Sequence, residues 1–311
     1  MTSAGPPDPV LVVLQPARGT LSVTGSEAKS WLNGLVTCDV LKVEPGRGAF
    51  GLSLNKQGKI QSEVEIVATD EGLLVGVSPG AAERLVASLD RFLVMEDAEL
   101  QDVSANYLWA DFHGLGAIAL AEAAAKLCGG SAAGIRYGSE VAATLVFERD
   151  ELLELERFVE RTPTLRRATD SDWEALRISQ GLGRFGVDFG DADNPHEAAL
   201  DRRAVSWSKG CYLGQEVVCM QDMRGKVKRR LVVLEGGPEL GSALAQGPAV
   251  ELNVLGPDGS SVGQVTSRHD GSAGGIRLLA SIFSSAIESS SGLSVLGQPV
   301  RVVEGAQPLL S

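Results

Sequence analysis

Alternating apolar and polar positions predict a series of short strands in the first part of the chain. One of them places Ile60, Val64 and Ile66 on a single face, because side chains on a strand alternate with a period of two residues. Polar and glycine-containing clusters at residues 55–58 and 70–72 interrupt the apolar runs and mark turns. The strands predicted in this way are residues 11–14, 21–24, three segments within 48–78, and 107–112.

A different spacing predicts helices between these strands. Between residues 81 and 93 the apolar side chains, among them Leu85, Val86 and Leu89, recur at the i, i+3, i+4 spacing of a helix stripe. Residues 25–34 predict a short helix that ends at an Asn-Gly pair, and residues 115–127 predict an alanine-rich one. Because helices and strands are mixed without strict alternation, the predicted fold class is α+β.

The last quarter of the chain has a different texture, in which short apolar runs alternate with Gly, Pro and Ser turns. This pattern is typical of a small barrel or sandwich. The runs are residues 231–234, 249–255, 262–265, 293–295 and 300–303. We therefore predict an α+β region over residues 1–223 and a C-terminal β-barrel domain over residues 224–311.

Charge and composition narrow the possible functions. The 311 residues include 28 Lys and Arg against 40 Asp and Glu, a formal net charge of −12 that opposes general binding to nucleic acid or to anionic membranes. Aromatic residues make up 5% of the chain, too few for a base-stacking surface. Residues 1–10 do not resemble a signal peptide, and no run approaches the roughly 20 apolar residues of a membrane span. The expected location is the cytoplasm, with reduced thiols.

Several catalytic patterns occur but lack the context that their chemistry requires. Residues 46–51 and 181–186 match G-x-G-x-x-G, yet neither lies between a predicted strand and the start of a helix. Residues 76–80 match G-x-S-x-G, but Pro79 has no backbone N–H to donate to an oxyanion, so Ser78 is predicted to belong to a helix N-terminal cap. No cysteine pair has C-x-x-C spacing and the chain has three histidines, so no metal site is predicted.

Residues 209–216, Lys-Gly-Cys-Tyr-Leu-Gly-Gln-Glu, do not fit a generic loop. Lys209 precedes Cys211 by two residues, and the run from Gln215 onward predicts the start of a helix. A nearby ammonium and the positive end of a helix dipole both favour thiolate over thiol. The alternative interpretation is a buried structural cysteine in a glycine-rich turn.

This octapeptide resembles the K-G-C-Y-x-G-Q-E signature of the YgfZ-type folate-binding proteins. These proteins are relatives of the glycine-cleavage T-protein (aminomethyltransferase) and serve in iron–sulfur cluster assembly or repair. Four further stretches resemble the family in the same order, so that the resemblance covers nearly the whole chain. They are residues 23–40 (V-T-G, then L-x-G-x-V-T-x-D-V), 54–60 (L-N-x-Q-G-x-I), 194–200 (P-x-E-A-x-L) and 262–267 (G-x-V-T-S).

The resemblance implies a three-subdomain clover with an aminomethyltransferase-like folate-binding region and a small C-terminal β-barrel. One subdomain would combine about residues 1–45 with 106–205, and a second would span about residues 46–105. The resemblance also implies tetrahydrofolate as the cofactor. Together with the charge argument above, it makes Cys211 the reactive group and Lys209 its electrostatic activator. It places near the folate Gly210, Tyr212, Gly214, Gln215, Glu216, Arg177, Ser179, Gln180 and Asn55.

Two positions depart from the related patterns. The family motif L-R-x-E-A-G reads L-R-I-S-Q-G here, so Ser179 replaces the glutamate that reaches the pterin ring. A serine does not match the two N–H bonds that a carboxylate accepts, so folate binding is expected to be weaker or to rely on Gln180 or another acid. Gln215 stands where the T-protein has arginine, and a neutral amide does not hold an anionic glutamate tail as a guanidinium does.

These observations lead to three functional hypotheses. The first is a tetrahydrofolate-binding accessory protein for iron–sulfur cluster assembly or repair, which affects tRNA modification through cluster-containing enzymes. Its partners would be folate and iron–sulfur client or assembly proteins, without a membrane. The second is a folate-dependent aminomethyltransferase, and the third is a binding-only scaffold that has lost folate. The basic run at residues 224–230 is either a solvated strand edge or a guide for polyanions such as a polyglutamate tail, an acidic partner or tRNA.

Overall fold

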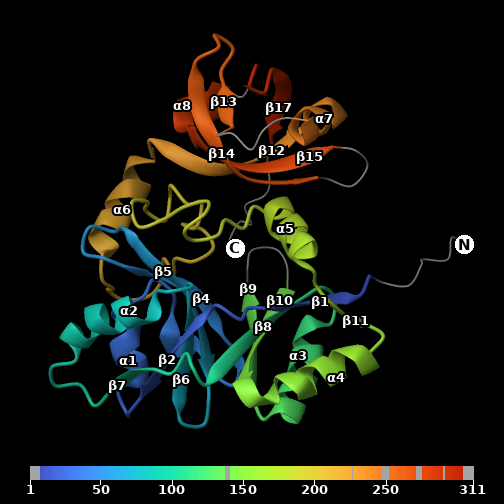
Figure 1. Cartoon of the computed structure of the whole chain (residues 1–311). Coiled ribbons are helices and arrows are strands. Elements are labelled where there is room, and N and C mark those ends of the chain that lie inside the picture. Colours follow the sequence, from blue (N-terminus) through green and yellow to red (C-terminus); the bar gives the residue numbers. More distant parts are fainter. Residues whose placement is uncertain are drawn as a thin grey trace, which may run out of the picture. The chain divides into compact units, whose positions relative to one another are not determined.

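The computed structural model describes residues 8–136, 141–225, 227–246, 252–270, 275–289 and 291–303. The chain forms two compact units, and each unit is built from three separate stretches of the sequence (Figure 1). Unit 1 contains Met1–Lys56, Gln61–Thr169 and Ala204–Leu213. Unit 2 contains Gln57–Ile60, Asp170–Arg203 and Gly214–Ser311.

Unit 1 is built on two sheets. The first has six strands in the order β11-β1-β8-β10-β9-β3, and the second has five in the order β4-β5-β6-β2-β7. Strands of the first sheet are β1 (Val10–Leu14), β3 (Gly46–Arg47), β8 (Tyr107–His113), β9 (Ser131–Arg136), β10 (Val141–Glu148) and β11 (Leu165–Arg167). Strands of the second are β2 (Gly19–Thr24), β4 (Ala49–Leu54), β5 (Ile60–Ala68), β6 (Gly72–Val77) and β7 (Glu99–Asp102).

Helices cover both sheets of unit 1 with apolar faces. Ala117, Ala121 and Ala124 of α3 are fully buried, because small side chains let this helix lie close to the first sheet. Trp31 of α1 and Leu85 of α2 pack in the core of the second sheet. The helices are α1 (Ala28–Asn33), α2 (Ala82–Leu89), α3 (Ala117–Cys128) and α4 (Leu152–Arg161), with short 3₁₀ turns η1 (Val40–Lys42), η2 (Asp90–Phe92) and η3 (Arg149–Glu151).

A polar cluster around Arg18 joins the two sheets of unit 1. The Arg18 guanidinium donates to Asp111 of β8 at 2.9 Å and to Glu65 of β5 at 2.5 Å. Its carbon atom lies 5.6 Å from the ring centroid of Trp109, which is fully buried and donates its own N–H to Thr20 at 2.9 Å. Ion pairs of this kind fix how two elements pack, because a buried charge needs its partners in place.

Unit 2 contains a closed barrel with the strand order β12-β15-β14-β13-β16-β17. The barrel core consists of apolar side chains such as Leu234, Val254 and Leu278, each fully buried. Its strands are β12 (Arg229–Gly236), β13 (Asn253–Leu255), β14 (Ser261–Asp270), β15 (Ile276–Phe283), β16 (Ser294–Val295) and β17 (Gln298–Val302). Its helices are α5 (Asp170–Ser179), α6 (Gln215–Arg224), α7 (Pro238–Gln246) and α8 (Ser284–Ser289).

The predicted α+β class and the C-terminal barrel are confirmed, as is the helix that starts at Gln215. The sequence pattern missed the strands β3, β7, β9, β10, β11 and β15 and the helices α4, α7 and α8. Residues 249–251 of one predicted run lie outside the described residues. The cap role of Ser78 was wrong: its hydroxyl accepts the backbone N–H of Glu63 at 3.1 Å, and Ala81 precedes α2. The Ser78 hydroxyl is therefore bonded to the neighbouring strand β5 and does not cap the N-terminus of α2.

All the barrel strands follow residue 224, but α5 and α6 cluster with them in the same unit. The division of the chain at residues 223 and 224 thus stays a prediction about where the barrel domain begins. Across the described part of the chain, the helices are too short or too polar to cross a membrane.

Close backbone packing at Gly263 generates a testable expectation for the barrel. A Cβ at this position of β14 would lie 2.5 Å from the carbonyl O of Ser281 and 2.9 Å from the Cα of Ile282. We expect Gly263→Ala to lower the free energy of unfolding by about 1–3 kcal/mol, because the obstructing atoms are backbone. Gly190→Ala is the matched control: a Cβ there meets nothing within 4 Å, so little change is expected. Denaturant unfolding measures both, and equal effects would contradict this packing.

Candidate functional site

The side chain of Lys209 holds the signature segment against the end of α1. Its Nζ donates to the carbonyl oxygens of Asn33 at 2.6 Å, Val36 at 2.8 Å and Cys38 at 2.7 Å. An ammonium group has three N–H donors, so each of them has an acceptor. Burial lowers the pKa of Lys209, and the nearby Cys38 and Asp39 oppose that shift. The ammonium thus works as a clamp on the loop that follows α1.

Backbone hydrogen bonds extend this clamp along the chain. The N–H of Leu213 donates to the carbonyl of Gly34 at 3.0 Å, and the N–H of Ser206 donates to the carbonyl of Thr37 at 2.9 Å. The buried Thr37 hydroxyl in turn donates to the carbonyl of Ala204 at 2.5 Å. Two stretches of the family resemblance, far apart in sequence, are therefore fastened side by side in unit 1.

The four cysteines are free thiols that differ in accessibility. Cys211 is exposed and Cys219 is half-buried, whereas Cys38 and Cys128 are buried. Burial raises the pKa of Cys38 to about 12, although the charge of Lys209 opposes this, and burial raises the pKa of Cys128 to about 11. Cys211 is thus the thiol most open to solvent. Activation of Cys211 by Lys209 stays a prediction, because the ammonium protons point to backbone carbonyls.

Other predicted site residues of unit 1 support this arrangement. Tyr212 is buried, and its ring centroid lies 5.4 Å from the Nζ of Lys209, within the range of a cation–π contact. Gly210 has open space where a Cβ would lie. Asn55 directly follows β4, where the chain turns toward β5. The structure therefore brings Lys209 and Tyr212 into contact and leaves Cys211 exposed between them in sequence.

Three of the resembling stretches meet in unit 2. The turn before β5 approaches α6 so closely that a Cβ at Gly58 would lie 2.9 Å from the Cβ of Val217. In the same turn, the Nζ of Lys59 lies 3.4 Å from a carboxylate oxygen of Glu197, and the N–H of Ile60 donates to the carbonyl of Asp193 at 3.0 Å. Glycine is required at position 58 because its φ is +69° and because the branched side chain of Val217 leaves no room for a Cβ.

Gly214, Gln215 and Glu216 form the start of α6. Gly214 is the N-cap with a left-handed φ of 82°, which suits glycine. Glu216 is exposed in the first turn, where a carboxylate complements the positive end of the helix dipole. Gln215, the first residue of the helix, is half-buried. These residues give the end of the signature its turn into a helix.

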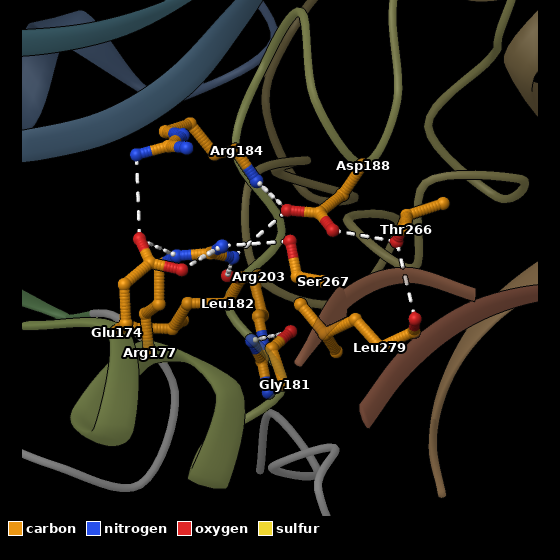
Figure 2. Close-up of polar contacts among 10 residues, drawn as sticks. All are labelled: Glu174, Arg177, Gly181, Leu182, Arg184, Asp188, Arg203, Thr266, Ser267 and Leu279. Atoms are coloured by element: carbon orange, nitrogen blue, oxygen red, sulfur yellow. Dashed lines mark hydrogen bonds and ion pairs between the residues drawn. The ribbon is translucent and has the colours of Figure 1, made fainter. Parts of the chain in front are cut away.

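A buried guanidinium organises the end of α5 (Figure 2). Arg177 is 1% exposed. It donates to Glu174 through Nε at 2.8 Å and Nη2 at 2.5 Å, and to Asp188 through Nη1 at 2.8 Å. The remaining donors reach the carbonyl of Leu182 at 3.3 Å and the hydroxyl of Ser267 at 2.7 Å. All five N–H groups thus have acceptors, so a contact between Arg177 and a cofactor would require one of these bonds to be exchanged.

The charges around Arg177 outweigh its burial. Burial alone lowers the pKa of Arg177, but hydrogen bonds and charge from Glu174 and Asp188 raise it overall. Asp188 is buried and also accepts from the backbone N–H of Arg184 at 2.9 Å and from the hydroxyl of Thr266 at 2.6 Å. The guanidinium and this carboxylate therefore fasten α5, the loop after it and β14 to one another.

A β-bulge explains why two neighbouring residues of β14 both reach this network. Pairing with β15 shifts register between Val265 and Ser267, so Thr266 is the extra residue. Successive strand residues normally point to opposite faces, whereas a bulge re-aims one of them. Thr266 consequently reaches Asp188 while Ser267 reaches Arg177. This geometry accounts for the T-S pair in the resembling stretch at residues 262–267.

Ser179 and Gln180 end α5 next to this network. The Ser179 hydroxyl donates to the carbonyl of Leu176 at 2.7 Å, one turn back in its own helix. The backbone carbonyl of Gln180 accepts from Arg203 at 2.7 Å, and burial lowers the pKa of Arg203 to about 10. The side-chain Nε2 of Gln180 is buried and, among the described residues, has no hydrogen-bond partner.

The sequence reasoning missed three polar residues that hold these sites together: Thr37, Asp188 and Ser267. Thr37 and Ser267 lie within stretches that resemble the family, so those motifs were the available signal. Asp188 lies outside them, in a loop that no periodicity marks. In the described part of the chain, no cluster of three or more His, Cys, Asp or Glu side chains has the arrangement of a metal site.

The Arg177 network predicts a large effect of a small change. Asp188→Asn keeps the side-chain volume but removes the negative charge beside a buried guanidinium, so we expect the free energy of unfolding to fall by about 3 kcal/mol. Arg184→Gln is the control, because its ion pair with Glu174 at 3.3 Å involves a side chain that is 49% exposed. Exposed pairs contribute about 0–1 kcal/mol. Urea unfolding tests the two, and a loss for Arg184→Gln as large as that for Asp188→Asn would refute the assignment.

Comparison with known proteins shows which sequences this chain is similar to. Residues 15–144 match the GCVT N-terminal domain. The chain is 27% identical over 71% of its length to a "tRNA-modifying protein YgfZ" of Vibrio vulnificus, of which it covers 68%. It is 26% identical over 70% of its length to an "Iron-sulfur cluster assembly factor IBA57 homolog, mitochondrial" of Mycosarcoma maydis, of which it covers 55%.

A solved structure supports the fold. The glycine cleavage system aminomethyltransferase T of Bartonella henselae superposes with a TM-score of 0.77 at 15% identity, over 98% of this chain and 89% of that one. The predicted aminomethyltransferase-like fold is thereby confirmed. Residues 15–144 thus match the GCVT N-terminal domain, and about 70% of the chain is similar to YgfZ-type proteins, the group whose signature the octapeptide at residues 209–216 resembles.

Proposed function

We propose that this protein is a tetrahydrofolate-binding accessory protein of iron–sulfur cluster assembly or repair, with Cys211 as its reactive group. In this proposal it affects tRNA modification through enzymes that carry iron–sulfur clusters. The names of its relatives, a tRNA-modifying protein and an iron–sulfur cluster assembly factor, support this role. The proposal places the protein in the cytoplasm, where a free thiol stays reduced.

The single observation that carries the proposal is the way the signature segment is held. Lys209 and the backbone bonds of residues 206 and 213 fix the chain on both sides of Cys211, yet the cysteine itself is exposed. An exposed thiol on a fixed segment is available to a partner or ligand in a defined position. A cysteine that served only to fill the core would be buried, as Cys38 is.

The end of α5 offers a group suited to a reduced pterin. The amide Nε2 of Gln180 is a buried donor that lacks a partner in the described ranges, and a buried donor left unpaired costs about 1–3 kcal/mol. A pterin ring presents carbonyl and ring-nitrogen acceptors to such a donor. Bound tetrahydrofolate would supply a reduced pterin that carries one-carbon units. The role of this chain's residues would be to hold it, with Gln180 donating to an acceptor of the pterin instead of a carboxylate accepting from its N–H groups.

A complementation assay tests the role of Cys211. In a bacterial strain that lacks its own YgfZ-type protein, we expect Cys211→Ala to reduce the tRNA modifications made by iron–sulfur enzymes at least tenfold relative to this chain, as measured by nucleoside mass spectrometry. Cys219→Ala is the matched control and is expected to retain function, because that cysteine lies in α6 and is half-buried. Full function of Cys211→Ala would sink the assignment of the reactive group.

Calorimetry with tetrahydrofolate tests the cofactor separately. We expect Gln180→Leu to weaken binding at least tenfold, because it removes the unpaired donor. Ser179→Glu is expected to strengthen binding about tenfold, equivalent to about 1.4 kcal/mol, by restoring a carboxylate. Glu239→Gln, on α7, is the control variant with unchanged affinity. Absence of binding by the wild-type chain at millimolar ligand would select the scaffold hypothesis instead.

A further inference from the structure

The loop between η2 and β7 presents two adjacent apolar side chains to solvent. Val94 is 79% exposed and Met95 is 92% exposed. The residues just before them, Phe92 and Leu93, are half-buried and pack against the core of the second sheet. Figure 1 shows this turquoise segment reaching outward from α2 before it returns to β7. We refer to Val94 and Met95 together as the apolar tip.

The loop that carries the apolar tip is fixed by hydrogen bonds on its near side. One carboxylate oxygen of Glu96 accepts the backbone N–H groups of Val94 at 2.9 Å and Met95 at 3.0 Å. The indole N–H of Trp31 donates to the carbonyl of Phe92 at 3.1 Å. The conformation of the tip is therefore set by polar contacts of its neighbours, and its own side chains are left free.

The far side of the loop is fastened to the start of α1. The N–H of Asp97 donates to the Glu27 carboxylate at 2.7 Å, and the N–H of Glu27 donates to the carbonyl of Asp97 at 3.0 Å. The Asp97 carboxylate accepts the hydroxyl of Ser26 at 2.6 Å. A Cβ at Gly25 would lie 2.3 Å from the Asp97 carbonyl oxygen, so only glycine permits this approach. The glycine of the V-T-G stretch thus serves to seat this loop.

A fixed loop with an exposed apolar tip has the properties of a docking element. Burying an apolar side chain of this size stabilises a folded or bound state by about 1.5–3 kcal/mol. In the isolated chain, two consecutive side chains lack this stabilisation. A tip that is already ordered loses little further conformational entropy when a partner covers it. The unbranched side chain of Met95 also adapts to pockets of irregular shape.

The charges around the tip indicate the kind of partner. Residues 90–99 contain four carboxylates, those of Asp90, Glu96, Asp97 and Glu99, against the single guanidinium of Arg91. Hydrogen bonds from the N–H groups of Met95 and Val94 lower the pKa of Glu96, and the Ser26 hydroxyl lowers the pKa of Asp97, so both stay ionised at neutral pH. Negative charge around the tip repels tRNA and anionic membranes and attracts a basic protein surface.

We propose that the apolar tip docks into an apolar pocket on a partner protein, and that lysine and arginine side chains border this pocket. The surface lies on a different loop from the signature segment, so the inference goes beyond the proposed function and does not depend on folate. Its chemistry resembles other protein interfaces, in which a small apolar centre supplies most of the affinity and a charged rim supplies orientation.

A double variant tests the tip in the complementation assay described above. We expect Val94→Ser with Met95→Ser to lower tRNA modification at least tenfold, while the melting temperature and the affinity for tetrahydrofolate stay unchanged. Leu115→Ser is the matched control, because Leu115 is 87% exposed on another loop. A charge variant, Glu99→Lys, is expected to lower modification as well, since it reverses one charge of the rim. Full modification by the double variant overturns the proposal.

A second measurement identifies the surface that covers the tip. A photo-crosslinking phenylalanine analogue in place of Met95 is irradiated in cells, and the adduct is mapped by mass spectrometry. A crosslinked peptide from another protein with lysine or arginine beside apolar residues supports the proposal, provided that Glu99→Lys reduces its yield. An adduct within a second copy of this chain, or with tRNA, overturns it. The crosslink does not rely on folate or on Cys211, so its failure is distinguishable from failure of the proposed function.

Discussion

The fold depends on a buried guanidinium, that of Arg177, and a half-buried ammonium, that of Lys209, whose N–H donors each have an acceptor. A guanidinium or ammonium removed from water is stable only where carboxylates or carbonyls replace its hydration. Arg177 meets this requirement with five bonds inside unit 2, and Lys209 meets it with three inside unit 1. Because these acceptors come from segments distant in sequence, each cation fixes several segments at once. A residue of the signature can therefore position segments of the fold as well as take part in the chemistry of the site.

This constraint gives the glycines and hydroxyls of the resembling stretches a physical meaning. Thr37 is needed because its hydroxyl reaches the segment that carries Lys209. Ser267 is needed because the guanidinium of Arg177 requires a further acceptor, and the bulge at Thr266 provides the direction. The side chain of Cys211 does not hold segments of the fold together in this way, since it is exposed. Its place in the octapeptide is thus explained by function more readily than by packing.

The sequence predicted regular elements well where periodicity was clear. The strands before residue 80 and helix α2 follow from apolar spacing and from turn residues. The helix that starts at Gln215 was predicted from a run of residues without helix breakers. Strand β15 was missed because Leu278, Leu279 and Ala280 form a continuous apolar run, which does not distinguish a buried strand from a helix. Strand β7 was missed because most of its residues are polar and exposed at a sheet edge.

The candidate site was predictable only in part, for a reason that its contacts make plain. The octapeptide marked Lys209, but the acceptors of its ammonium are backbone carbonyls, and any residue type provides one. The residue types at positions 33–38 do not indicate that their carbonyls accept hydrogen bonds from Lys209. Likewise Arg177 was assigned to a ligand from resemblance, while its five hydrogen bonds go to two carboxylates, a carbonyl and a hydroxyl spread over about 90 residues. Long-range pairing of this kind becomes visible only in three dimensions.

Cations that pair with groups inside the protein also affect how the net charge of −12 is expressed at the surface. In the basic run, Arg230 pairs with Asp201 at 2.9 Å and donates to the His196 carbonyl, and Arg229 lies 4.1 Å from the ring centroid of Phe283. Cations engaged in this way contribute less to a polyanion-binding patch than their number in the sequence indicates. Carboxylates that remain in water then dominate the surface potential. The proposed link to tRNA through iron–sulfur enzymes would fit such a surface better than direct contact with the nucleic acid, whose phosphates would be repelled.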